Sequence, residues 1–228
     1  KHCNVFYDID LEKNTKDIST GTCLVLITPD GERSMNTYLG ATEFLKLNDI
    51  NFGVLETTEW LYLEGYRFDG QDSQLAFNDS VKAVKNSGGK VALTLSDPFC
   101  VDRYRDDFRH LIRSGVDLVF CNESELISYV EKSSLNECLE VCSGLSTVFV
   151  CTAGPRGAFI CHSGQVTHVP TEKLKALDVT GAGDFFAAGF LGGMINNADF
   201  STSADYGNRA AAAIIQQFGC RLEGDFLS

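Results

Sequence analysis

Short apolar runs alternate with amphipathic stretches along most of the chain, beginning near residue 57. The runs lack the polar alternation of half-buried strands, so they predict parallel strands covered on both faces at 60–64, 91–96, 118–121 and 148–152. Apolar residues at helical spacing between them predict helices at 106–113, 122–131 and 135–143. This order predicts an open, mostly parallel sheet that binds ligands at the carboxyl ends of its strands.

Two other parts of the chain have the pattern of β-hairpins. Residues 5–9 and 22–27 are strand-like, and the turn Thr28-Pro29-Asp30-Gly31 favours a return strand at 34–39. After residue 152 the pattern predicts a second hairpin from 157–161 and 165–169.

Two helices are expected at the C-terminal end of the chain. Residues 185–195 (FFAAGFLGGMI) are apolar on every side, which predicts a helix buried all round. In the last helix one face is formed by Ala211, Ile214, Ile215 and Phe218, and Gly219 is expected to end it.

Composition limits the partners and the compartment that we expect. A net charge of -12 argues against nucleic acid or an acidic membrane surface as partner, since both attract clustered Lys and Arg. No apolar run is long enough to span a bilayer, and residues 1–4 lack the apolar core of a signal peptide. The nine cysteines are scattered without a CxxC pair, which favours reduced thiols in a cytoplasmic protein.

The segment Asp178-Val179-Thr180-Gly181-Ala182-Gly183-Asp184 combines small residues with a carboxylate at the start of a predicted helix. Small residues leave the backbone N–H groups accessible, and the N-terminus of a helix attracts anionic oxygens. A carboxylate repels a phosphate, so its presence favours a base that takes a proton from a hydroxyl attacking that phosphate. The alternative is a glycine-rich turn in which Asp184 only caps the helix.

Three further segments lie where such a sheet binds ligands or where a flap could cover them. Thr152-Ala153-Gly154-Pro155-Arg156-Gly157 follows a predicted strand and suits either a nucleotide loop or an ordinary turn. Asn122-Glu123-Ser124-Glu125 follows another strand, where it can form a capping box or order a hydrated Mg²⁺. Arg33, in the first hairpin, is either a surface residue or a cation over a transferred phosphate.

Two common classes of phosphate-transferring enzyme are excluded by missing motifs. The sequence has no GxxxxGK[ST] loop, so it is not a P-loop enzyme, and no HRD loop with DFG, so it is not a protein kinase. It also lacks a GxSxG elbow, and its four histidines do not cluster in sequence.

Together these segments resemble the ribokinase-like (PfkB) family of carbohydrate and nucleoside kinases. The family's D-x-T-G-A-G-D is matched by 178–184, its N-x-x-E by Asn122 and Glu125, and its T-x-G-x-x-G by Thr152, Gly154 and Gly157. The resemblance runs over essentially the whole chain. It implies an α/β, three-layer ribokinase-like fold, with a mostly parallel sheet flanked by helices and a small β lid.

The resemblance also implies roles in phosphoryl transfer from ATP. Asp184 would be the catalytic base, and Arg33 would reach the phosphates from the lid. The anion hole for the transferred phosphate would be formed by the amides of Gly181, Ala182 and Gly183. ATP would be bound by Thr152, Gly154, Gly157 and, near the adenine, Asn208.

Metal and acceptor sites are implied in the same way. Asn122 and Glu125 would organise Mg²⁺ through water, while Asp178 and Thr180 match a loop that often binds K⁺ in the family. Within the family the chain looks most like adenosine kinases and adenosine-kinase-like sugar kinases. Met35 and Phe99 match positions where adenosine kinases place apolar groups near the acceptor base.

The chain departs from the family pattern in length. Members usually run to about three hundred residues, still within the range of one α/β domain. The first strand with its hydroxyl-binding Asp, and a Gly-Gly-Asn substrate loop, are not found before Lys1. We therefore expect a β lid segment and its return to the core at 1–40. We expect an α/β nucleotide-binding core at 41–228 whose N-terminal part is missing.

The favoured function is ATP-dependent phosphorylation of the primary hydroxyl of adenosine or a related ribosyl compound. One alternative is a sugar kinase acting on ribose or fructose, and another is a truncated relative that binds nucleotide without turnover. The expected partner is a small nucleoside or sugar. The chain is expected to be a monomer, or a homodimer paired through the edges of its lid strands.

Overall fold

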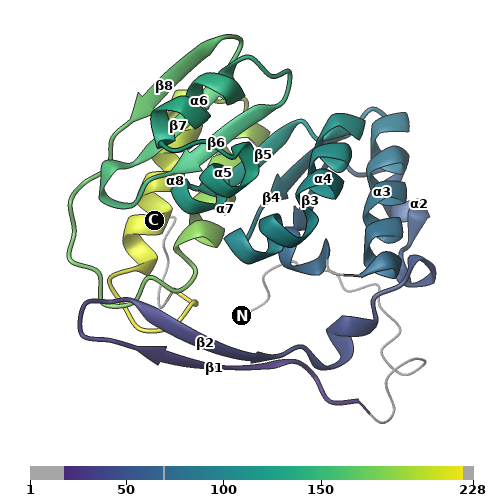
Figure 1. Ribbon diagram of the computed structural model, residues 1–228, viewed down its shortest axis with the longest axis horizontal. Coiled ribbons are helices and arrows are strands. Elements are labelled where there is room, and N and C mark those ends of the chain that lie inside the picture. Colours follow the sequence, from purple (N-terminus) through teal and green to yellow (C-terminus); the bar gives the residue numbers. More distant parts are fainter. Residues whose placement is uncertain (1–17, 69, 223–228) are drawn as a thin grey trace.

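The computed structural model describes residues 18–68 and 70–222, and the strand expected at 5–9 lies outside these ranges. Its centre is a six-stranded sheet in the order β3-β4-β5-β6-β7-β8, and a separate hairpin, β1-β2, extends beside it (Figure 1). The strands are β1 (Thr22–Ile27), β2 (Arg33–Tyr38), β3 (Trp60–Glu64), β4 (Lys90–Thr94), β5 (Leu118–Asn122), β6 (Val148–Thr152), β7 (Ala158–His162) and β8 (Gln165–Val169).

Helices cover both faces of the large sheet. Helices α3 to α6 lie on one face, and α7 and α8 lie on the other (Figure 1). The helices are α2 (Phe52–Leu55), α3 (Gln71–Asn86), α4 (Pro98–Gly115), α5 (Glu123–Val130), α6 (Leu135–Ser143), α7 (Ala182–Ile195) and α8 (Phe200–Ile214). Short 3-10 turns occur at Gly40–Phe44, Leu47–Asp49, Gly65–Phe68 and Gly154–Arg156.

The pairing of the strands confirms the predicted open, mostly parallel sheet. Strands β3 to β6 run parallel to one another, and β7 and β8 continue the sheet as an antiparallel hairpin. Strands β3, β6 and β8 occupy the ranges that the sequence predicts. In the small hairpin the amide of Gly31 donates to the carbonyl of Thr28 at 2.9 Å, which closes the predicted turn.

Successive side chains of the central strands serve two separate cores. On β4, Val91 and Leu93 pack into the core under α3 to α6, while Ala92 packs into the core under α7 and α8. On β5, Val119 packs into the core under α3 to α6, and Phe120 packs into the core under α7 and α8. Because both faces are covered, these strands contain apolar residues at nearly every position.

Two helices on the first face differ from the sequence prediction. Helix α4 begins eight residues earlier than expected, because the Asp97 carboxylate accepts a hydrogen bond from the Phe99 amide at 2.7 Å and Pro98 follows the cap. Helix α3 has no counterpart among the predicted helices. Its buried face is formed by Phe77, Val81 and Val84, which have helical spacing.

The prediction that residues 185–195 are buried all round is wrong. Helix α7 buries Phe186, Ala187, Phe190 and Gly193, but Ile195 is 56% exposed. The sheet and α8 cover one side of the helix, and Ala188 on another side is exposed. The apolar composition of residues 185–195 therefore predicted burial on every side, whereas the described residues cover only part of the surface of this helix.

The predicted end of the last helix is also wrong. Helix α8 ends at Ile214, and Phe218 lies beyond it with 70% of its surface exposed. Gly219 has a positive φ of 85°, but its amide donates to the Asp178 carboxylate at 2.9 Å instead of ending the helix. This tertiary hydrogen bond directs the chain away from the helical path.

Glycines set the close packing of α7 against α8. A Cβ at Gly189 would lie 2.6 Å from the carbonyl oxygen of Tyr206, and a Cβ at Gly207 would lie 2.8 Å from that of Phe186. Both obstacles are backbone atoms, which cannot move aside as a side chain can. By contrast, a Cβ at Gly192, on the same helix, would meet no atom within 4 Å.

We predict that Gly189→Ala lowers the free energy of unfolding by about 1–3 kcal/mol, because it overpacks this contact. The matched variant Gly192→Ala should be neutral or stabilising by up to about 1 kcal/mol, since alanine is the better helix former. Urea denaturation of both variants measures the difference. Equal stability of the two variants would contradict this account of the α7–α8 contact.

Candidate active site

Polar side chains gather at the carboxyl edge of the parallel strands. Glu64, Asn122 and Thr152 end β3, β5 and β6, and Ser96 follows β4. Parallel strands bring their carboxyl ends to the same edge, so these residues lie along one side of the sheet. The hydroxyl of Ser96 reaches the carboxylate of Glu64 at 3.4 Å across two of these strand ends.

Helix α7 points its N-terminus at the same edge. Its N-cap, Gly181, has a left-handed φ of 83° and provides no side-chain cap. The amide of Ala182 donates to the Val179 carbonyl at 3.2 Å, and a Cβ at Gly183 would meet no atom within 4 Å. The first turn of α7 is therefore open and has amides without intrahelical partners, which is the local requirement for binding an anion.

Asp184 lies in this first turn but does not act as the helix cap, which is Gly181. Burial raises the pKa of Asp184, and the nearby positive charge of Arg33 opposes that shift. The lid thus brings its arginine close to the carboxylate that the sequence singled out. A carboxylate with a raised pKa is a better proton acceptor than an ordinary one.

The hairpin is attached next to α7. The amide of Val179 donates to the carbonyl of Gly31, in the hairpin turn, at 3.2 Å. Arg33 begins β2 directly after this turn. The link explains how an arginine on an otherwise exposed hairpin is placed over the N-terminus of α7.

Asn122 and Glu125 form the complete capping box of α5. The Asn122 side chain accepts from the Glu125 amide at 2.9 Å, and the Glu125 carboxylate accepts from the Asn122 amide at 3.0 Å and side chain at 2.6 Å. Glu125 is 5% exposed. Burial raises the pKa of Glu125 to about 7, helped by the charges of Asp97 and Glu64 and opposed by the Asn122 hydrogen bond.

The loop after β6 uses its two glycines differently. Gly157 has a φ of 86°, and a Cβ there would lie 2.2 Å from the Val169 carbonyl oxygen, so a close approach of two backbones requires glycine. Gly154 has a φ of 54°, but a Cβ there would meet nothing within 4 Å. Thr152 donates to the Cys121 carbonyl at 3.4 Å. Open space for a ligand is therefore next to Gly154.

Asp178 and Thr180 stiffen the loop that leads into α7. The Asp178 carboxylate accepts from the amides of Thr180 and Gly219, both at 2.9 Å. Although burial alone would raise it, the pKa of Asp178 is lowered by hydrogen bonds from the Thr180 side chain and from the amides of Gly219 and Thr180. The Thr180 hydroxyl oxygen is buried beside this carboxylate, and the two oxygens together are groups that the loop could offer to a cation.

The last three candidates from the sequence are Asn208, Met35 and Phe99. Asn208 is buried on α8, and its side-chain amide donates to the carbonyls of Val169 and Pro170, each at 3.2 Å. This clamp connects α8 to the segment that leaves β8. Met35 on β2 is 49% exposed and Phe99 at the start of α4 is 76% exposed. Both apolar side chains are available for contact with a ligand.

Any divalent cation here would be held mainly through water. In residues 18–68 and 70–222 no group of three or more His, Cys, Asp or Glu side chains is arranged to ligate a metal directly. Mg²⁺ usually keeps several of its waters, so separate carboxylates at suitable distance are enough. The charges of Glu64 and Asp97 act on Glu125, and carboxylates placed in this way fit such a hydrated ion.

Glu64 and Tyr62 belong to this site but were not among the candidates from sequence. Burial, followed by the charge of Asp184, raises the pKa of Glu64. The Tyr62 hydroxyl hydrogen-bonds with Glu64, and burial raises the pKa of Tyr62. A usable signal existed, because Glu64 ends an apolar strand just as Asn122 and Thr152 do.

Comparison with known proteins identifies the family. The chain matches the model of the pfkB family carbohydrate kinases over residues 7–224, and it belongs to that family. Among solved structures, an adenosine kinase from Sinorhizobium meliloti is 36% identical with a TM-score of 0.85, covering 89% of this chain and 63% of its own. A probable sugar kinase from Rhizobium etli is 36% identical with a TM-score of 0.84, covering 88% and 62%.

Curated relatives include both nucleoside and sugar kinases. An adenosine kinase from Saccharomyces cerevisiae is 28% identical over 218 residues, 89% of this chain and 63% of the relative. A fructokinase from Escherichia coli is 28% identical over 197 residues, 82% of this chain and 62% of the relative. The chain thus spans less than two thirds of these relatives. These likenesses confirm the ribokinase-like α/β fold.

In the described part no helix is both long and apolar enough to cross a bilayer.

We predict that Glu125 makes stability depend on pH. Its pKa of about 7 lies above the usual 4.5, so the folded protein keeps a proton that the unfolded chain releases as the pH rises. The free energy of unfolding should therefore fall between pH 4.5 and 7, by up to about 3 kcal/mol. In Glu125→Gln this loss should become clearly smaller, and the raised pKa values of Glu64 and Asp184 should account for what remains.

Urea denaturation at several pH values tests this, with Glu140→Gln as a control on an exposed carboxylate of α6. The control should keep the pH dependence of the unmodified protein. A Glu125→Gln variant that also keeps it would show that Glu125 is not the group responsible.

Proposed function

We propose that this protein transfers the terminal phosphoryl group of ATP to the primary hydroxyl of adenosine or a related ribosyl compound. The observation that supports this most directly is the position of Asp184. It lies in the open first turn of α7, and Arg33 of the lid lies close enough to affect its pKa. A base, anion-binding amides and a cation therefore meet at one place, as phosphoryl transfer requires.

In the proposed reaction the acceptor hydroxyl oxygen attacks the γ-phosphorus in line. A new oxygen–phosphorus bond forms, the bond to the bridging oxygen of ADP breaks, and the hydroxyl proton passes to Asp184. The amides at Gly181 and Gly183, and that of Ala182 once it releases the Val179 carbonyl, stabilise the negative charge on the transferred group. Arg33 adds positive charge from the lid.

The same proposal covers the nucleotide and the ions. The ATP phosphates and ribose lie along Thr152, Gly154 and Gly157, where the structure has open space next to Gly154. Mg²⁺, ordered through water by Asn122 and Glu125, would neutralise phosphate charge. K⁺ would be bound in the loop of Asp178 and Thr180.

A sugar kinase is the second candidate, because the relatives include a fructokinase and a probable sugar kinase. Exposed apolar groups favour the nucleoside. Met35 and Phe99 present large apolar surfaces to solvent, and a flat aromatic base covers such surfaces more fully than a free sugar with its many hydroxyl groups. The reaction at Asp184 is the same in both cases.

We predict that Asp184→Asn lowers kcat by about 10²–10⁴-fold, because the amide cannot accept the hydroxyl proton. Binding of ATP should persist, which calorimetric titration can measure. Asp205→Asn, on an exposed position of α8, is the matched control and should leave kcat unchanged. Near-normal turnover of Asp184→Asn would refute the role of Asp184 as the base.

We further predict that ADP release with adenosine as acceptor gives the highest kcat/KM in a panel of adenosine, ribose and fructose. Higher values for ribose or fructose would replace the nucleoside proposal with the sugar kinase. Binding of ATP without ADP release for any acceptor would instead identify a nucleotide-binding protein without turnover.

A further inference from the structure

Ser96, just beyond β4 at the candidate active site, has a backbone conformation that is unusual for serine. Its φ is 66°, in the left-handed region that glycine adopts easily and other residues rarely do. The amide of Asp97 donates to the carbonyl of Leu95 at 2.8 Å, so Ser96 is the centre of a three-residue turn. With a positive φ at its centre, such a γ-turn is of the rare and strained form.

Three other described residues besides glycine have a positive φ, but each lies where a chain commonly turns. Glu131 is the C-cap of α5, Asn197 follows the end of α7, and Ser163 lies in the turn between β7 and β8. Helix ends and hairpin turns favour the left-handed conformation. Ser96 instead follows a buried strand, and a glycine there would make the same turn without strain.

The side chain of Ser96 reaches the carboxylate of Glu64. Its hydroxyl lies 3.4 Å from a Glu64 oxygen, across the ends of β3 and β4. The hydroxyl of Tyr62 also hydrogen-bonds with Glu64. In the part of the chain that the structure describes, Glu64 forms no ion pair. This carboxylate is therefore held by neutral hydroxyl groups, and its charge remains available to a further partner.

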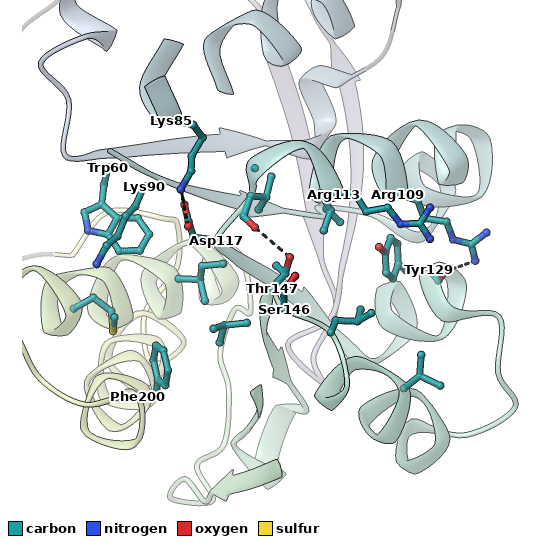
Figure 2. A pocket seen from close by; sticks show the side chains of 18 of the residues that line it. Trp60, Lys85, Lys90, Arg109, Arg113, Asp117, Tyr129, Ser146, Thr147 and Phe200 are labelled. Atoms are coloured by element: carbon teal, nitrogen blue, oxygen red, sulfur yellow. Dashed lines mark hydrogen bonds and ion pairs between the residues drawn. The ribbon is translucent and has the colours of Figure 1, made fainter. Parts of the chain in front are cut away.

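Asp117 lines a pocket at the opposite edge of the sheet and shows how a carboxylate is held for structure alone (Figure 2). It contacts the Lys85 ammonium with both oxygens, at 2.7 and 2.8 Å, and accepts from the Val91 amide at 2.8 Å. Its charge is neutralised within the protein. Glu64 differs, because Asp184 lies near enough for its negative charge to act on Glu64. A cation that arrives with a ligand would be attracted by both carboxylates.

We propose that Ser96 is a positioning residue, whose hydroxyl holds the Glu64 carboxylate ready for the cation that ATP brings to the candidate active site. This rests on the proposed function, because the cation is the one bound to the ATP phosphates. The strained turn follows from placing a side chain where glycine would fit better. Loss of the hydroxyl should therefore weaken binding of ATP with its metal ion, while loss of the strain should stabilise the fold.

Two variants separate the hydroxyl from the backbone strain. Ser96→Ala removes the hydroxyl and keeps the strain, whereas Ser96→Gly removes both. In urea denaturation the midpoint of Ser96→Gly should lie above that of Ser96→Ala, because glycine adopts this φ freely. Equal midpoints would contradict the strained turn. The matched control is Ser163→Gly, which changes a serine with a φ of 50° away from the candidate active site.

Calorimetric titration with ATP measures the role of the hydroxyl without turnover. With Mg²⁺ present, ATP should bind about tenfold more weakly to Ser96→Ala and to Ser96→Gly, the loss expected for one hydrogen bond to a charged group. Without Mg²⁺ both variants should bind ATP like the unmodified protein, since no cation then needs Glu64. The Ser163→Gly control should bind normally in both conditions. A normal affinity of Ser96→Gly for ATP with Mg²⁺ would overturn the proposal.

A double-mutant cycle in urea links the effect to Glu64 and needs no ligand. Ser96→Ala should lower the urea midpoint of the unmodified protein but not that of Glu64→Ala, where the contact is already absent. If Glu64→Ala fails to fold, Glu64→Leu takes its place, because it fills the space without an acceptor. Additive losses would overturn the proposal. An unmodified protein that binds no ATP would instead count against the proposed function, and the cycle would still decide whether Ser96 holds Glu64.

Discussion

The candidate site depends on several carboxylates that lie near one another with little positive charge, and of these Glu125 is buried, Glu64 is half-buried and Asp184 is exposed. Burial raises the pKa of Glu64, of Asp184 and of Glu125, and in Glu64 and Glu125 the charges of neighbouring carboxylates raise it further. Among the described residues the cation that acts on Asp184 is Arg33. Such a group of acids favours protonation, or the arrival of positive charge with a ligand. A hydrated metal ion bound with phosphate meets that need, and this is why carboxylates and an anion site can share one edge.

The scaffold holds these groups by backbone contacts more than by side-chain pairs. Gly189 and Gly207 let α7 and α8 pack closely, which sets the direction of α7. Asp178 ties the loop before α7 to the amide of Gly219, and the Val179 amide ties it to the lid at Gly31. Helix direction, loop and lid are thus connected, so a change in one of them shifts the others.

The sequence predicted local features well and long-range ones less well. Strand β6, helix α6 and the turn at Gly31 follow from apolar periodicity and turn chemistry, which depend on near neighbours. Burial of α7 and the place of Phe218 depend on which distant segments cover them, and periodicity contains no such information. The position of Glu64 at a strand end was visible in the sequence, but its electrostatic link with Asp184, far away in the chain, was not.

The central claim is that the N-terminus of α7 at the carboxyl edge binds the phosphates of ATP. Calorimetric titration with ATP and Mg²⁺, on the unmodified protein and on Gly183→Val, tests it most directly. A valine there would extend into the open space over the first turn of α7, where the phosphate is expected. The account predicts saturable one-site binding that Gly183→Val abolishes. Absence of saturable heat, or the same affinity in the variant, would contradict it.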